Sequence, residues 1–120
     1  MAIKLIHNTG IQTEIQTCIK EIQIMSQVKH KNIVDFIGIS CVVQKQEVWL
    51  ISELMDYDLS KAIPSLTLFN KQKISKGIAK GMHYLHSFDP PVLHRDLKIT
   101  NVKLIFFFYI FLFFFFTFFL

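Results

Sequence analysis

Three side chains with complementary chemistry stand close together in residues 94–101, HRDLKITN. Asp96 could accept a proton from a hydroxyl group. Lys98 could neutralise the charge of a phosphate group, and Asn101 could offer its amide oxygen to a hard cation such as Mg²⁺. A charged surface loop is the alternative interpretation, and such a loop would need none of these spacings. Together the three groups place a proton acceptor, a cation and a metal ligand on one short segment.

The same segment matches the pattern H-R-D-x-x-x-x-N at each fixed position. That pattern is typical of the catalytic loop of eukaryotic protein kinases, and the chain resembles this family. The resemblance implies transfer of the γ-phosphoryl group of ATP, with Mg²⁺, to a hydroxyl of a protein substrate. It implies that Asp96 is the catalytic base, that Lys98 contacts the γ-phosphate and that Asn101 is a Mg²⁺ ligand. Lys98 favours a serine/threonine kinase, and HRDLK with PPVLH is most similar to the tyrosine-kinase-like group.

Weaker parts of the resemblance lie at the start of the chain. A strand is predicted over residues 2–6 and a helix over 13–29, where Thr13 can cap the helix and apolar residues repeat every three or four positions. The segment HKNIVDFIG is similar to the one that follows this helix in kinases. By resemblance Lys4 binds the α- and β-phosphates of ATP, and Glu21, 17 residues later, orients Lys4. A solvated helix charge is the alternative for Glu21.

Two β-rich runs, residues 36–43 and 47–53, are separated by three polar residues and predict an antiparallel hairpin. The second run resembles the kinase strand that leads to the hinge between the two lobes. The resemblance implies that Ser52 is the gatekeeper of the ATP pocket. It also implies that Glu53 and Met55 belong to the hinge, whose backbone groups bind adenine.

A second long helix is predicted over residues 68–87. Its apolar face follows steps of four, four and three residues: Ile74, Ile78, Met82 and Leu85. Gly77 and Gly81 lower its helix propensity by up to ~1 kcal/mol each, which predicts close packing around them. A short helix over residues 59–63 precedes it, and a two-residue strand over 92–93 should enter the catalytic loop.

These elements predict an α+β chain with a partial protein-kinase fold. It contains part of the N-lobe sheet with its helix, the hinge and the start of the helical C-lobe. The family's domain is longer than 120 residues, and no Gly-rich phosphate loop precedes Lys4. We therefore expect a kinase domain truncated at both ends, with its partial domain over residues 1–104.

Beyond Asn101 the sequence departs from the family pattern. Lys103 stands where kinases place an apolar residue beneath adenine, and an unpaired buried ammonium is costly. The Asp-Phe-Gly segment should follow Asn101 by about a dozen residues, where residues 113–116 are all Phe. We therefore expect the chain as written to be inactive. The alternative function is a non-catalytic, pseudokinase-like or membrane-anchored fragment.

Residues 105–120 form a Phe-rich tail without charge, which holds ten of the thirteen phenylalanines. The apolar run over residues 104–120 is at the lower limit of the ~17–25 residues that span a membrane as a helix. Three interpretations remain open: sequence foreign to an evolved kinase, a membrane-inserting tail, or a buried strand or helix.

The charge and the cysteine content of the chain limit the classes of partner and ligand that it is expected to bind. The net charge is +4 with no basic run, so nothing predicts nucleic-acid binding. Cys18 and Cys41 lack the spacing of a zinc site or a disulfide framework, and they fit reduced, buried thiols of a cytosolic protein. No signal peptide is expected at the N-terminus. The predicted partners are ATP and a protein substrate, and the predicted location is cytoplasmic, or membrane-associated through residues 105–120.

Overall fold

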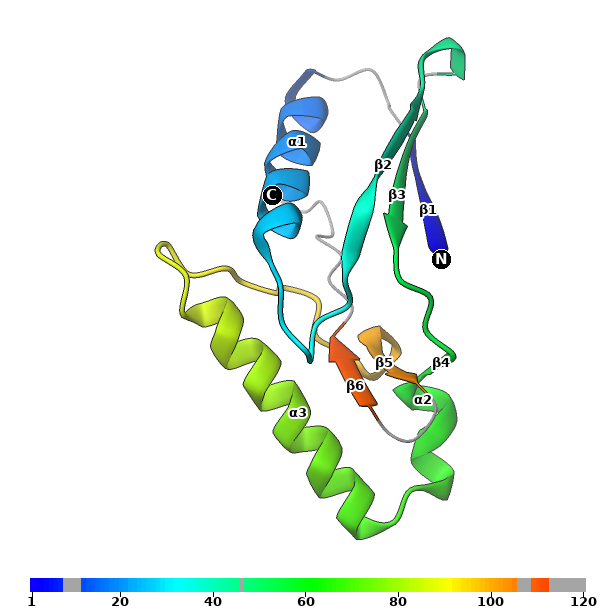
Figure 1. Cartoon of the computed structure of the whole chain (residues 1–120), viewed down its shortest axis with the longest axis vertical. Helices are drawn as coiled ribbons and strands as arrows, with labels where there is room; N and C mark the ends of the chain where they lie inside the picture. Colours follow the sequence, from blue (N-terminus) through cyan, green and yellow to red (C-terminus); the bar gives the residue numbers. More distant parts are fainter. Residues whose placement is uncertain (8–11, 46, 106–108, 113–120) are drawn as a thin grey trace. The chain divides into compact units, whose positions relative to one another are not determined.

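The structure is a computed structural model that forms two compact units (Figure 1). It describes residues 1–7, 12–45, 47–105 and 109–112. The first unit contains residues 1–29 and 35–54, and the second contains residues 30–34 and 55–120.

A three-stranded antiparallel sheet with the order β1-β3-β2 is the centre of the first unit. Its strands are β1 (Ala2–His7), β2 (Phe36–Val42) and β3 (Glu47–Ser52). A 3₁₀ turn, η1 (Val43–Lys45), follows β2. Helix α1 (Gln12–Gln27) lies alongside β2 in Figure 1. The structure thus confirms the predicted strand, helix and hairpin. Cys41 on β2 is exposed, however, so the prediction of a buried thiol at this position was wrong.

The core of the first unit contains Leu50 of the central strand and Val28, which follows α1. Ile22 and Met25, on the predicted apolar stripe of α1, are half-buried. The Val28 N–H donates to the carbonyl of Ile24 at 3.2 Å, which continues the helical bonding one residue beyond α1. Burial of this stripe orients the helix on the sheet.

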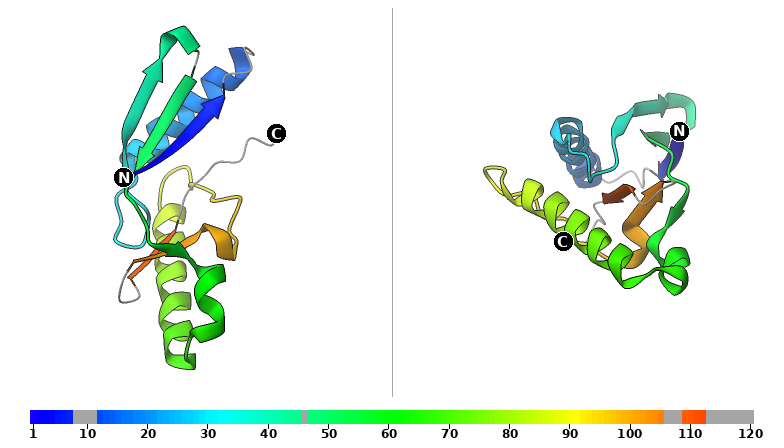
Figure 2. Two further views of the ribbon diagram at one scale, coloured as in Figure 1. Left: turned by 90° about the vertical axis from the view of Figure 1, so that its right-hand side faces the viewer. Right: turned by 60° about the horizontal axis from the view of Figure 1, so that its bottom comes forward.

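The second unit contains another antiparallel sheet, with the order β4-β5-β6. Its strands are β4 (Tyr57–Asp58), β5 (Val102–Ile105) and β6 (Tyr109–Leu112). Its helices are α2 (Leu59–Ala62) and α3 (Leu68–His86), with the 3₁₀ turns η2 (Ile63–Ser65) and η3 (Ile99–Asn101). Figures 1 and 2 show β6 next to α3, and the two elements are in contact.

Helix α3 begins at a side-chain cap and buries the face that its sequence predicts. Thr67 Oγ1 accepts a hydrogen bond from the Asn70 N–H at 3.2 Å. Ile74 and Leu85 are buried, at 3% and 0% exposure. Gly77 and Gly81 are buried as well, which confirms the predicted close packing around these glycines.

The predicted strand over residues 92–93 does not form. The Val92 N–H instead donates to the carbonyl of Leu85 at 3.0 Å, so its hydrogen bond goes to the end of α3 rather than to a neighbouring strand. The Val92 side chain is buried and that of Leu93 is half exposed. This prediction was wrong because a helix end supplied the partner that a strand would have needed.

Part of the Phe-rich tail is strand. Ile105 ends β5, and Tyr109–Leu112 form β6, with Tyr109 opposite Ile105. Residues 106–108 and 113–120 lie outside the described residues, and so does the Phe run at the Asp-Phe-Gly distance. Within the described ranges, no helix is both long enough and apolar enough to cross a membrane.

Candidate active site

The loop over residues 94–101 is built on a buried histidine. His94 is 2% exposed. The Asp96 N–H donates to the His94 carbonyl at 2.9 Å and lies 3.3 Å from His94 Nδ1. Between them Arg95 has φ 61°, in the left-handed region. That conformation costs a non-glycine residue roughly 1–3 kcal/mol and is retained mainly at functional sites. The turn directs the Asp96 side chain into the loop.

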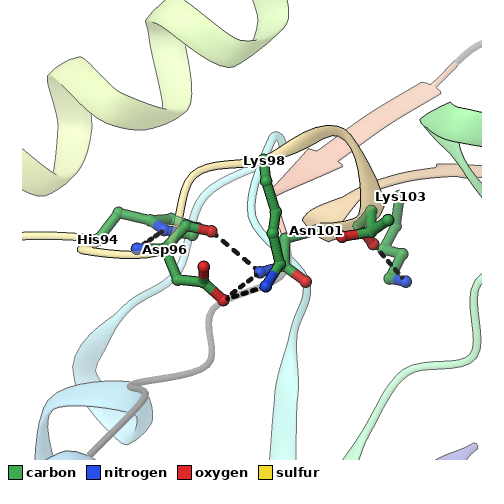
Figure 3. A network of polar contacts seen from close by, with 6 residues as sticks. His94, Asp96, Lys98, Asn101 and Lys103 are labelled. Carbon is green, nitrogen blue, oxygen red and sulfur yellow. Dashed lines mark hydrogen bonds and ion pairs between the residues drawn. The ribbon is translucent and has the colours of Figure 1, made fainter. Parts of the chain in front are cut away.

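Asp96, Lys98 and Asn101 converge within this loop, as Figure 3 shows. Asp96 Oδ2 lies 3.0 Å from Lys98 Nζ. Asn101 Nδ2 donates to Asp96 Oδ2 at 2.8 Å and to the Asp96 carbonyl at 2.9 Å. The η3 turn makes this arrangement possible, because the Asn101 N–H donates to the Lys98 carbonyl at 2.9 Å. The three side chains that the sequence singled out therefore form one connected cluster.

The cluster keeps Asp96 ionised. The hydrogen bond from Lys98 lowers the pKa of Asp96 most, and the bond from Asn101 and the positive charge of Lys98 lower it further. Partial desolvation raises this pKa but does not offset the other effects. Both side-chain bonds go to Oδ2, and Asp96 Oδ1 has no hydrogen bond within the described part of the chain. Oδ1 is therefore the oxygen of Asp96 that can accept a further hydrogen bond.

Lys103 lies on β5 between two buried residues. Val102 and Leu104 are buried at 2% and 0% exposure, whereas Lys103, between them on β5, is only half-buried. Its Nζ donates to the carbonyl of Thr100 at 2.8 Å (Figure 3). The expected penalty of an unpaired buried ammonium therefore does not arise. The participation of Thr100 was not predicted, because main-chain acceptors leave no signal in a sequence.

The predicted phosphate-binding pair belongs to the first unit. Lys4 lies on β1 opposite Leu50 of β3 and is exposed. Glu21 lies on α1 and is half-buried. Each of the two residues makes at least one polar or electrostatic interaction with its surroundings. A direct contact between Lys4 and Glu21 stays a prediction.

The predicted hinge begins where β3 ends. Ser52 is the last residue of β3, and the boundary between the two units falls between Leu54 and Met55. The Glu53 N–H donates to the Asp35 carbonyl at 3.0 Å, and Glu53 Oε1 accepts from the Asp35 N–H at 2.6 Å. Asp35 thus holds Glu53 in place at the start of the predicted hinge. Sequence reasoning missed this residue, since a main-chain contact does not depend on its side chain.

The protein kinase domain family matches residues 1–105 of the 120 residues. The chain belongs to the protein kinase domain family. Its two antiparallel sheets and few helices are those of a partial α+β kinase fold, which confirms the predicted fold class.

This kinase chain is similar to several curated proteins. It is 40% identical over 110 residues to a probable serine/threonine-protein kinase of Dictyostelium discoideum, covering 87% of this chain and 18% of the relative. A putative leucine-rich repeat receptor-like serine/threonine-protein kinase of Arabidopsis thaliana is 34% identical over 111 residues, covering 87% and 12%. A dual specificity protein kinase of D. discoideum is 31% identical over 117 residues, covering 87% and 5%. The kinase chain thus spans less than a fifth of the length of these relatives.

Proposed function

We propose that the loop over residues 94–101 is the catalytic loop of a serine/threonine kinase. Its reaction is transfer of the γ-phosphoryl group of ATP to a serine or threonine hydroxyl of a protein. The observation that carries the proposal is the convergence of Lys98 and Asn101 on one oxygen of Asp96, at 3.0 and 2.8 Å. This anchors the carboxylate through Oδ2 and leaves Oδ1 for the attacking hydroxyl. Phosphoryl transfer depends mainly on such positioning and on charge neutralisation.

Each side chain of the cluster has one role in this proposal. Asp96 orients the substrate hydroxyl and accepts its proton as the phosphoryl group transfers. Its lowered pKa keeps it unprotonated, so it is ready to accept a hydrogen bond at neutral pH. Lys98 is bound to Asp96 in this structure and would contact the γ-phosphate of bound ATP.

Mg²⁺ fits the donor set of the loop. Asn101 uses its Nδ2 group on Asp96, so its carbonyl oxygen Oδ1 is the atom that can bind a hard cation. Within the described residues no group of three or more His, Cys, Asp or Glu side chains could hold a metal. Mg²⁺ commonly takes only one or two protein ligands together with nucleotide phosphates, whose charge it neutralises.

The proposed function also includes the other ATP contacts that the sequence predicts. Lys4 would bind the α- and β-phosphates and Glu21 would orient it. Ser52, Glu53 and Met55 would border the adenine. The boundary between the two compact units falls after Leu54, which supports a hinge at this position. We also propose a cytoplasmic location, with membrane association through residues 105–120 as the alternative.

Serine/threonine specificity is supported by Lys98, two positions after Asp96, and by relatives named serine/threonine kinases. We further propose membership of the tyrosine-kinase-like group, which rests on HRDLK and PPVLH. A relative named a dual specificity kinase makes tyrosine transfer the competing outcome. Phosphoamino-acid analysis of the labelled product would separate the two.

We propose that the 120 residues alone do not transfer phosphate at a kinase-like rate. Phe occupies residues 113–116, and no acidic residue stands between Asp96 and residue 120. These features also favour a second function, a non-catalytic binding module. Nucleotide binding that persists without phosphoryl transfer would support the second function.

A loop transplant tests the catalytic assignment independently of the rest of the chain. HRDLKITN replaces the catalytic loop of an active serine/threonine kinase, and transfer of labelled γ-phosphate to a generic basic protein is measured. We expect activity within about tenfold of the recipient kinase, lost when Asp96→Asn is added. An inactive transplant that is folded and binds ATP would contradict the assignment.

A further inference from the structure

Helix α3 carries a groove that the proposed catalysis does not use. The groove has a volume of about 490 Å³ and lies wholly within the second unit. It is lined by His30 and by one face of α3 and its C-terminal cap, at residues 76, 79, 80, 83, 84 and 87. These positions recur every three or four residues, so they share one side of the helix.

The groove contains a rigid aromatic surface. The Tyr84 ring stacks on His30, with ring centres 4.8 Å apart and 20° between the planes. Phe88 meets the same tyrosine edge-on, with centres 5.3 Å apart. Rings fixed on two sides lose little side-chain entropy when a ligand binds, which favours recognition.

The rim of the groove is basic. Helix α3 contains four lysines, at positions 71, 73, 76 and 80, and no acidic residue. Lys76 and Lys80 line the groove four residues apart, and like charges at this spacing destabilise a helix slightly. In the described part of the chain neither lysine forms a salt bridge. Burial lowers the pKa of His30 most, and the positive charges of Lys31 and Lys80 lower it further, so the positive potential extends to the stacked rings.

We propose that this groove binds an acidic peptide segment of a partner protein. The carboxylates of the segment contact Lys76 and Lys80. An apolar side chain beside them packs on Ala79 and the Tyr84 ring. This orientation also avoids placing carboxylates at the C-terminal end of α3, where the helix dipole is negative.

The composition of the groove favours a carboxylate-rich peptide over other anions. Lysine binds carboxylates and phosphates alike, so the two lysines do not decide the anion. The apolar wall formed by Ala79 and Tyr84 beside them favours a peptide, which brings an apolar side chain together with its carboxylates, over a small phosphate anion. A nucleic acid would need a longer basic track than two lysines. The proposal goes beyond the catalytic function and does not depend on it.

Fluorescence anisotropy with the full 120-residue chain tests this proposal. The probe is a labelled peptide with the sequence EEDLEE. The controls are QQNLQQ, which lacks the charge, and EEDSEE, which lacks the apolar side chain. We expect saturable binding of EEDLEE that weakens at high salt, and weaker binding of both controls by about tenfold. No binding of EEDLEE up to about 1 mM would overturn the proposal.

Matched variants on the same helix locate the binding site. The double variant Lys76→Gln, Lys80→Gln should lower the affinity for EEDLEE by about tenfold. The double variant Lys71→Gln, Lys73→Gln lies outside the groove and should leave this affinity within about twofold. Ala79→Trp fills the groove at an exposed position and should abolish binding. Equal losses from both lysine pairs, or tighter binding of a single-stranded oligonucleotide than of EEDLEE, would contradict an acidic-peptide site.

Discussion

Asn101 holds Asp96 with both hydrogens of a single amide nitrogen. One bond goes to the Asp96 main-chain carbonyl at 2.9 Å, and the other goes to Oδ2 at 2.8 Å. An amide nitrogen has two hydrogens, so its donor capacity is fully used. In the proposed function, the amide oxygen of Asn101 would bind the metal and Asp96 Oδ1 would meet the substrate hydroxyl.

Removing the charge of Asp96 should therefore stop catalysis without dismantling the loop. In the transplanted loop we expect Asp96→Asn to lower kcat by about 10²–10⁴-fold, the usual contribution of a general base. The KM for ATP should change little, since the carboxylate acts on the hydroxyl substrate. Steady-state kinetics check this, with Asp96→Glu as the control that retains a carboxylate. If the KM for ATP rose by as large a factor as kcat fell, Asp96 would be assigned to ATP binding instead.

A double-mutant cycle tests the predicted contact between Lys4 and Glu21. The single changes are Lys4→Met and Glu21→Gln, and urea denaturation measures the free energy of unfolding. We expect a coupling energy of about 0.2–1 kcal/mol, typical of a partly exposed ion pair. A coupling energy of zero would contradict the predicted contact between Lys4 and Glu21.

His30 should titrate at a lower pH in the folded chain than in the unfolded chain. Burial lowers the pKa of His30 most, followed by the positive charges of Lys31 and Lys80. The folded state thus disfavours the protonated ring. The stability contribution is present above the unfolded pKa of about 6.5 and is lost as the pH falls toward the folded pKa.

Proton NMR of the imidazole ring measures this shift, with the chain in urea as the unfolded reference. The signal is assigned as the one missing from His30→Gln. Lys80→Gln should raise the folded pKa of His30 partway toward the urea value, whereas Lys71→Gln should not. A folded pKa of His30 at or above its urea value would contradict the prediction.

The N-terminal cap of α3 gives a local stability prediction. Thr67 Oγ1 accepts the only side-chain hydrogen bond found at this helix start in the described residues. Thr67→Ala should lower the free energy of unfolding by about 1 kcal/mol, because one main-chain N–H loses its partner. Thr67→Ser keeps the hydroxyl and should retain most of the stability. Urea denaturation followed by circular dichroism distinguishes these outcomes.

Leu85 should be the most sensitive position of α3. Its side chain is fully buried, so Leu85→Ala leaves a cavity and should cost about 2–5 kcal/mol. Leu68, on the same helix, is 73% exposed, and Leu68→Ala should stay within about 0.5 kcal/mol. Similar losses at both positions would show that Leu68 is covered in solution.

Local patterns in the sequence were sufficient to predict most of the elements. The repeat of apolar residues placed the helices near residues 12–27 and 68–86, and the β-rich runs placed the hairpin. These predictions succeed because helix and strand periodicity are properties of neighbouring residues. The strand predicted over residues 92–93 failed because its hydrogen bond depended on Leu85, several residues away.

By itself the sequence determined which residues carry the candidate chemistry, since Asp96, Lys98 and Asn101 are recognised by type and spacing alone. Only the tertiary structure decided which atoms of these residues are engaged. The left-handed turn at Arg95 and the η3 turn bring Lys98 and Asn101 onto the same oxygen of Asp96. The tertiary structure also decided that the Lys103 ammonium donates a hydrogen bond to the Thr100 carbonyl. The physical reason is that hydrogen bonds to main-chain atoms depend on backbone conformation, which side-chain identity alone does not specify.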